Sequence, residues 1–229
     1  LTSNANGNEG LFVNAQNGST VNMALTTANI DDSGDNGAVI QSETTSNMTI
    51  SLNSVVITDS MGQDGLFMQA NNNSTMNATL NQVDSRGNAD DGMDIRSNQS
   101  GTLTWSLTGS SELSGNGDSG IEFQAFDTSN FSGEFQNVSA FSNTNWGAYI
   151  NDDSTGTVTM DLGGGTLSTT GNNRIFNNTN NDIFVDVDGG TLRAENNWWG
   201  QAGGPLGGDV LLNSGTLDST PALGADPGP

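Results

Sequence analysis

The chain has 229 residues, with 26 acidic side chains against 4 basic ones, a net charge of -22, and no Cys or His. This charge repels nucleic-acid phosphates, and four arginines cannot neutralise it, so the composition excludes nucleic-acid binding. Because Lys is also absent, the chain lacks an imidazole base, a thiolate nucleophile, a Schiff-base lysine and a conventional zinc site. Carboxylate, hydroxyl and arginine chemistry remain. No apolar run is long enough to predict membrane insertion.

A repeat of 27 or 28 residues runs through most of the chain. Each repeat begins with a glycine that precedes an apolar, a variable and an apolar residue. These glycines are Gly10, Gly37, Gly65, Gly92, Gly120 and Gly147. Eleven residues after each glycine a second alternating run begins, as in Val21, Met23 and Leu25, and a third, weaker run precedes the next glycine. Three period-two strands per repeat predict coils whose inward side chains stack on those of the next coil.

The pattern therefore predicts an all-β fold, a parallel β-helix solenoid of about seven coils with three short strands per coil. Asn181 takes the glycine's place in the seventh coil, and Asp209 opens an eighth, partial coil. The extra residues at 163–180 are expected to bulge from the third side. We expect residues 1–229 to form a single domain that ends in a capping segment at 196–229.

The coil pattern and one local motif resemble a known family. The run Asn196-Asn197-Trp198-Trp199-Gly200, followed by Gly203-Gly204-Pro205, looks like the terminal signature of microbial surface proteins with right-handed parallel β-helix repeats, within the pectate-lyase-like superfold. This resemblance implies a right-handed coil and an extracellular or cell-surface location. The superfold includes lyases, hydrolases, esterases, adhesins and inert stalks, so function has to be argued from a site.

The outward residues of the first strand stack into columns of aromatic, amide and charged side chains. Planar surfaces beside hydrogen-bonding groups are typical of a sugar-binding strip. The residues that we assign to this strip are Phe67, Gln69, Arg96, Gln124 and Tyr149.

Asp94 and Glu122 occupy the same column in neighbouring coils. If they face each other, like charges raise one pKa, and the pair fits the acid and nucleophile of a retaining glycosidase. The alternative is that an acidic protein carries Asp and Glu on any exposed strand. Under that alternative the chain is not an enzyme, and the missing Lys and His and the lack of long loops around Asp94 favour this interpretation.

Aspartates also recur in the turn before each glycine. Asp64, Asp90, Asp91 and Asp118 are the best candidates for a Ca²⁺ site between coils, because Ca²⁺ needs several oxygen ligands. The alternative is that these aspartates make Asx-turns and keep the turns soluble. No cofactor is otherwise required by the sequence.

The chain begins partway round a coil, nine residues before Gly10. An open coil exposes unpaired N–H and C=O groups, which are a template for another strand. We expect either a segment of a longer protein or an end that meets another subunit. The leading hypothesis is an extracellular structural or adhesive β-helix, a fibre subunit or module of a surface protein that packs head to tail. The alternative is a polysaccharide-binding or polysaccharide-degrading domain.

Overall fold

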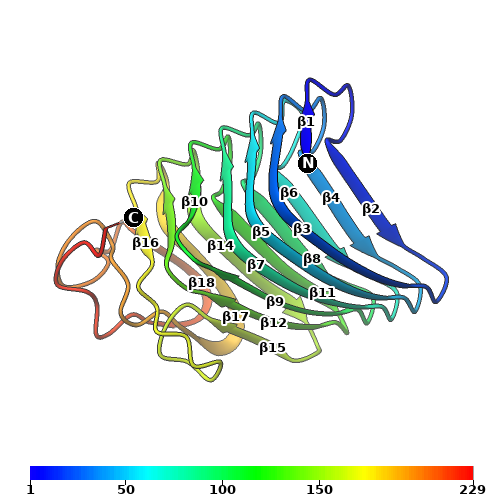
Figure 1. Ribbon diagram of the computed structural model, residues 1–229. Helices are drawn as coiled ribbons and strands as arrows, with labels where there is room; N and C mark the ends of the chain where they lie inside the picture. The colour runs from blue at the N-terminus through cyan, green and yellow to red at the C-terminus, as the bar shows by residue number, and fades with distance from the viewer. Residues whose placement is uncertain (229) are drawn as a thin grey trace.

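The computed structural model describes residues 1–228, and these form an all-parallel β-solenoid of about eight turns (Figure 1). The predicted parallel β-helix is confirmed. No helix in the described part of the chain is long and apolar enough to span a bilayer.

The first sheet holds the strand that follows each glycine. It contains the whole or the first part of β2 (Leu11–Ala15), β4 (Ala38–Ser42), β6 (Leu66–Ala70), β8 (Met93–Ser97), β11 (Ile121–Asp127), β14 (Trp146–Ser154), β17 (Asn181–Arg193) and β18 (Val210–Asp218). Each strand pairs in parallel with its equivalent one coil away, with Leu11 opposite Ala38 and Ile183 opposite Val210. The predicted register of the first six coils and the eighth coil are therefore confirmed.

The second and third sheets hold the other two runs of each coil. The second sheet contains the first part of β3 (Thr20–Asp31), β5 (Asn47–Thr58) and β7 (Thr75–Arg86), then β9 (Thr102–Thr108), β12 (Asn130–Phe135), β15 (Val158–Asp161) and the end of β17 and β18. The third contains β1 (Thr2–Asn4), the last part of β3, β5 and β7, then β10 (Ser111–Ser114), β13 (Val138–Phe141) and β16 (Arg174–Phe176).

The corner between these two sheets takes a single residue in the early coils. Thr27, Ser54 and Gln82 have φ values of 57°, 56° and 53°, so the backbone turns in the left-handed region and the strand continues on the next face. The second and third runs, expected as separate strands, are consequently one strand of 12 residues in β3, β5 and β7.

The core is a narrow column of inward side chains, one layer per coil. Met48, Ile50 and Leu52 are each 1% exposed in β5, and their equivalents in β7 and β9 are similarly buried. Because neighbouring coils also satisfy each other's backbone groups, a chain with only 32% apolar residues can fill this core.

The seventh coil differs from the prediction in two respects. Ala148 pairs with Ile183, so Asp182 and not Asn181 stands opposite Gly147. The extra residues lie between β15 and β16 and reach over the second sheet, where Leu167 shares a groove with Ser106 and Glu134. The Asp161 carboxylate holds them, since it accepts hydrogen bonds from the backbone N–H groups of Gly163, Gly165 and Leu167.

Candidate functional site

Residues predicted for catalysis and for sugar binding lie together on the outward face of the first sheet. Register pairs Phe67 with Asp94, Asp94 with Glu122, and Glu122 with Tyr149. The neighbouring column pairs Gln69 with Arg96 and Arg96 with Gln124. The structure thus places all seven residues on one patch formed by β6, β8, β11 and β14.

The turn aspartates border this patch because they stand just before the repeat glycines: Asp64 and Asp91 directly precede Gly65 and Gly92, and Asp90 and Asp118 stand one residue earlier in their turns. The backbone N–H of Asp91 donates to Asp64 Oδ1 at 3.2 Å, and the N–H of Ser119 donates to Asp91 Oδ1 at 2.7 Å. Each carboxylate is therefore fixed by the turn of the following coil. Both side chains are buried, at 5% and 3% exposure.

Two groups of carboxylates in this region are close enough to share a cation. Oxygen atoms of Asp64, Asp91 and Asp94 lie within 4.8 Å of one another, as do those of Asp90, Asp91 and Asp118. Such oxygens are ligands that Ca²⁺ prefers. The four residues predicted for calcium are thus brought together, with Asp94 as an unexpected neighbour, and the calcium site itself stays a prediction.

Burial sets the electrostatics of the cluster. It raises the pKa of Asp64 to about 8 and that of Glu122 to about 9, with further increases from neighbouring carboxylates. Burial also raises the pKa of Asp91 to about 6. A hydrogen bond between the Asp91 and Glu122 side chains lowers the pKa of Asp91 and raises the pKa of Glu122.

Arg96 supplies the counter-charge to Asp94. Its Nε donates to Asp94 Oδ1 at 2.7 Å, and its Nη2 forms an ion pair with Oδ2. Burial raises the pKa of Asp94 to about 6, against the lowering effect of Arg96. Glu122 therefore has the protonation state of a general acid at neutral pH, but Asp94 is 2% exposed and both its oxygens are engaged. This arrangement favours binding over nucleophilic attack.

An aromatic group extends the patch toward the C-terminal coils. The rings of Tyr149 and Phe184 stack with centroids 4.4 Å apart and 5° between their planes, and Trp146 lies 5.0 Å from Tyr149. At the other side the Arg96 guanidinium lies 5.5 Å from the Phe67 ring centroid. Sequence reasoning missed Trp146, although it directly precedes Gly147 as Asp91 precedes Gly92.

Comparisons with known proteins found no similar protein. No protein-family model matches the chain, and neither the curated proteins nor the solved structures gave a match. Function therefore has to be inferred from the solenoid and from this patch.

Proposed function

We propose that this chain is a structural or adhesive β-helix of an extracellular or cell-surface protein, and that its first coil receives a further parallel coil. The observation that carries this proposal is the unpaired strand edge of the first described coil, which a preceding segment of a longer chain or another copy could equally cover. Within the described residues, β2 pairs with β4 but with no preceding strand, and the first part of β3 pairs only with β5. A free parallel edge is a template for strand addition.

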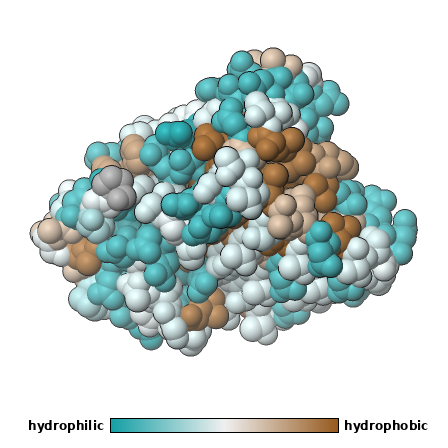
Figure 2. Space-filling model, in the orientation of Figure 1, coloured by the Kyte–Doolittle hydropathy of each residue, from teal (hydrophilic) through white to brown (hydrophobic). Residues whose placement is uncertain are grey.

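The end also leaves core residues incompletely covered. Val21, Met23 and Leu25 are partly exposed, whereas the equivalent residues of the next coil are 1% exposed. Phe12, on the outward face of β2 in the same coil, is 57% exposed. Figure 2 shows apolar residues gathered on the side where the N-terminal strands lie. An added coil of the same repeat would bury this apolar surface, and each Å² removed from water would contribute about 25 cal/mol of stabilising free energy.

Self-association of the purified chain tests the proposal. We expect the mass measured by light scattering to rise with concentration, and end-to-end particles in negative-stain electron micrographs. Val21→Asp places a charge on the exposed end of the core and should give monomers. The matched control is Asn22→Asp, one residue along β3 on the opposite, exposed face, which should still associate. A wild-type chain that stays monomeric at all concentrations contradicts association between copies.

The aromatic group favours polysaccharide binding as a second candidate function. Parallel stacked rings of Tyr149 and Phe184 adjoin Glu122, whose Oε1 accepts a hydrogen bond from Gln124 at 2.8 Å. Rings beside carboxyl and amide groups suit the apolar face and the hydroxyls of a sugar. Saturable binding to a polysaccharide panel that Tyr149→Ala abolishes and Phe12→Ala retains would support it. The absence of saturable binding would exclude it.

A further inference from the structure

The last coil carries a surface of the same kind as the first coil. β18 pairs with β17 along one edge, and within residues 1–228 no strand lies along its other edge. Leu212 stands inward, in register with the fully buried Val185, yet it is 48% exposed. Leu211, on the outward face, is 44% exposed. Because β2 and β18 lie at opposite ends of the stack (Figure 1), the described chain has two half-covered coils that face away from each other.

On the first sheet these two ends match residue by residue. Successive register pairs lead from β2 through β4, β6, β8, β11, β14 and β17 to β18. They make Leu211 the equivalent of Phe12, and Leu212 the equivalent of Val13. A second copy stacked in this register would place Leu212 on Val13 in the core and Leu211 on Phe12 outside. Each contact would remove two exposed apolar side chains from water.

The second sheet continues the match. The same series of register pairs makes Leu217 the equivalent of Met23, and both are inward side chains that are only partly buried. The outward Asp218 would stand beside Ala24, which is small and uncharged, and it already forms an ion pair with Arg193. The core of one copy would therefore continue into the core of the next.

The backbone edges also have complementary polarity. In the first sheet the N–H after each corner donates to the corner carbonyl of the following coil, as Leu11 N–H does to Gly37 O at 3.0 Å. The corresponding donor on the free edge of β18 is Val210 N–H, and the corresponding acceptor on the first coil is Gly10 O. Stacking last coil on first coil pairs these groups in parallel. Two first coils with aligned cores would instead meet antiparallel, which breaks this register.

Charge is compatible with the same contact. Residues 10–30, which include β2 and the part of β3 in the second sheet, contain no charged side chain in a chain with a net charge of -22. β18 carries one, the paired Asp218. The strands that meet therefore add little like-charge repulsion.

The third sheet is the exception, because the tail and β1 would occupy the same place. Leu223 N–H donates to Asn197 O at 3.0 Å before the tail turns back along the outside, where Asp226 pairs with Arg174. β1 of a stacked copy would overlap this start of the tail. β1 has only three residues, and Leu1 beside it is 54% exposed, so we expect β1 to detach and the contact to rest on the first two sheets.

We propose that β18 of one copy adds in parallel to β2 and to the first part of β3 of a second copy. This inference rests on the proposed function and goes beyond it by naming what covers the first coil, which is the last coil of another copy. The two surfaces lie at opposite ends, so the contact does not close and copies add into an unbranched filament.

Two variants that each block one end test the proposal. Leu212→Asp places a charge on the last coil, and Val13→Asp places one on the first. In sedimentation velocity each variant alone should be monomeric where the wild type assembles, with the Kd raised about tenfold or more. An equimolar mixture should give heterodimers and nothing larger, since each partner keeps one intact end. Leu206→Asp, the same change at a 62% exposed position outside the sheets, is the matched control and should assemble like the wild type.

The remaining outcomes separate this inference from the proposed function. Assembly of Leu212→Asp at wild-type affinity, or a mixture without heterodimers, would overturn the inference and leave the covering of the first coil standing. A monomeric wild type would also overturn it alone, because a preceding segment of a longer chain would still cover that coil. Assembly of Val13→Asp at wild-type affinity would contradict both. If Val13→Asp does not fold by circular dichroism, Phe12→Asp, on the exposed outward face of β2, takes its place.

Discussion

At the scale of single residues, the repeat glycines are required by close backbone approach. A Cβ at Gly92 would lie 2.5 Å from the carbonyl oxygen of Gly120 and 2.7 Å from the Asn116 side chain. This backbone contact leaves no room for a side chain at that corner. Asp182 occupies the equivalent position in the seventh coil, so its carboxylate is placed inside the corner where the other coils have only hydrogen.

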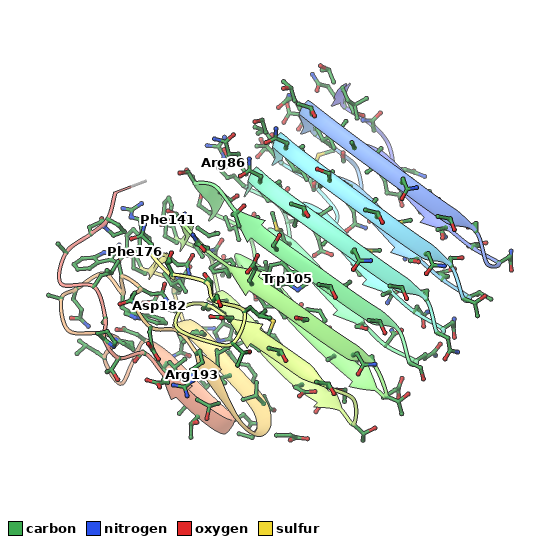
Figure 3. All side chains as sticks on the ribbon, turned by 60° about the horizontal axis from the view of Figure 1, so that its bottom comes forward. Arg86, Trp105, Phe141, Phe176, Asp182 and Arg193 are labelled. Atoms are coloured by element: carbon green, nitrogen blue, oxygen red, sulfur yellow. The ribbon has the colours of Figure 1, made fainter. Side chains whose placement is uncertain are left out.

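Gly133 has a different role, because it makes room for Trp105, which Figure 3 labels in the second sheet. The indole is 2% exposed and stacks on Phe123 with centroids 4.6 Å apart. A Cβ at Gly133 would collide with Cε2, Nε1 and Cζ2 of that ring. We expect Gly133→Ala to lower the free energy of unfolding by about 1 to 3 kcal/mol, measured by urea denaturation.

Gly133→Ala also reduces the backbone freedom of the unfolded chain, which stabilises the fold by only about 0.4 to 1 kcal/mol and so offsets a small part of the expected loss. Ser132→Ala, on the outward face of the same strand, is the control and should be nearly neutral. In a Trp105→Leu background the cost of Gly133→Ala should shrink, because the clash is gone. An equal cost in both backgrounds would contradict the steric explanation.

The carboxylate cluster predicts that stability falls as pH rises. The pKa values of Asp64, Asp91 and Glu122 in the folded chain are about 8, 6 and 9, against ordinary values of 3.8 for Asp and 4.5 for Glu. The folded chain therefore retains protons that the unfolded chain has lost. The stabilisation is complete below about pH 4 and is lost as pH rises through the folded pKa values. We expect the melting temperature in chelator to fall between pH 5 and pH 9.

Glu122→Gln tests whether the carboxylate cluster causes this fall of the melting temperature with pH. The substitution keeps a neutral hydrogen-bonding group where the protonated carboxyl stood, so the melting temperature should depend less on pH. Glu43→Gln, which changes a surface carboxylate bonded to Gln16, should retain the wild-type slope. Identical slopes in all three proteins would show that other groups determine the pH dependence.

At the scale of elements, the turns between the third and first sheets are tied by a ladder of buried asparagines. Asn88, Asn116 and Asn143 each donate from Nδ2 to the Oδ1 of the next asparagine at 2.9 Å, and the ladder ends with Asn178 donating to Asp182 Oδ1. The backbone N–H groups of the same residues donate to the same oxygens. A carboxylate at the donor end of aligned amides is electrostatically favourable.

We expect Asn116→Ala to lower the free energy of unfolding by about 2 to 4 kcal/mol in urea denaturation. The substitution leaves the buried N–H and side-chain amide of Asn88 without their acceptor, and each such loss costs about 1 to 3 kcal/mol. Asn77→Ala, an exposed asparagine on β7, should cost little. Equal losses for the two variants would show that the ladder does not stabilise the turns.

The elements were largely predictable because the glycine and the alternating runs repeat at fixed spacing. The ladder was not recognised, although the sequence carries it: Asn116 and Asn143 stand four residues before their glycines, and Asn178 stands four before Asp182. That spacing identifies Asp182, not Asn181, as the glycine equivalent. The path of the 163–173 insertion was not predictable, since it depends on hydrogen bonds from the insertion to Asp161.

The candidate site was predictable in position but not in chemistry. Column membership placed Asp94, Glu122 and Arg96 on one face. Whether Asp94 is free depends on the rotamer of Arg96, and whether Glu122 is protonated depends on burial by neighbouring coils. The spacing of the residues along the sequence indicates neither the ion pair of Asp94 nor the protonation state of Glu122.

At the scale of the whole molecule, stacking places like charges close together. A net charge of -22 is carried by a chain with only 4 arginines, and equivalent positions in adjacent coils are separated by about 4.8 Å. Asp90 and Asp118 are such neighbours, because the Asp118 N–H donates to Asp90 O at 3.0 Å. We therefore expect repulsion between coils to outweigh the few ion pairs, which salt would weaken.

Salt should accordingly stabilise the solenoid. The Debye length falls from about 10 Å at 0.1 M to about 3 Å at 1 M ionic strength, below the spacing between coils. We expect the melting temperature in chelator to rise by about 5 °C or more between 0.05 and 1 M NaCl. Sucrose at equal osmolality is the control for solvent exclusion and should produce a smaller rise. A melting temperature that is unchanged or lower at 1 M NaCl would mean that the arginine ion pairs, rather than repulsion between coils, dominate the electrostatic free energy.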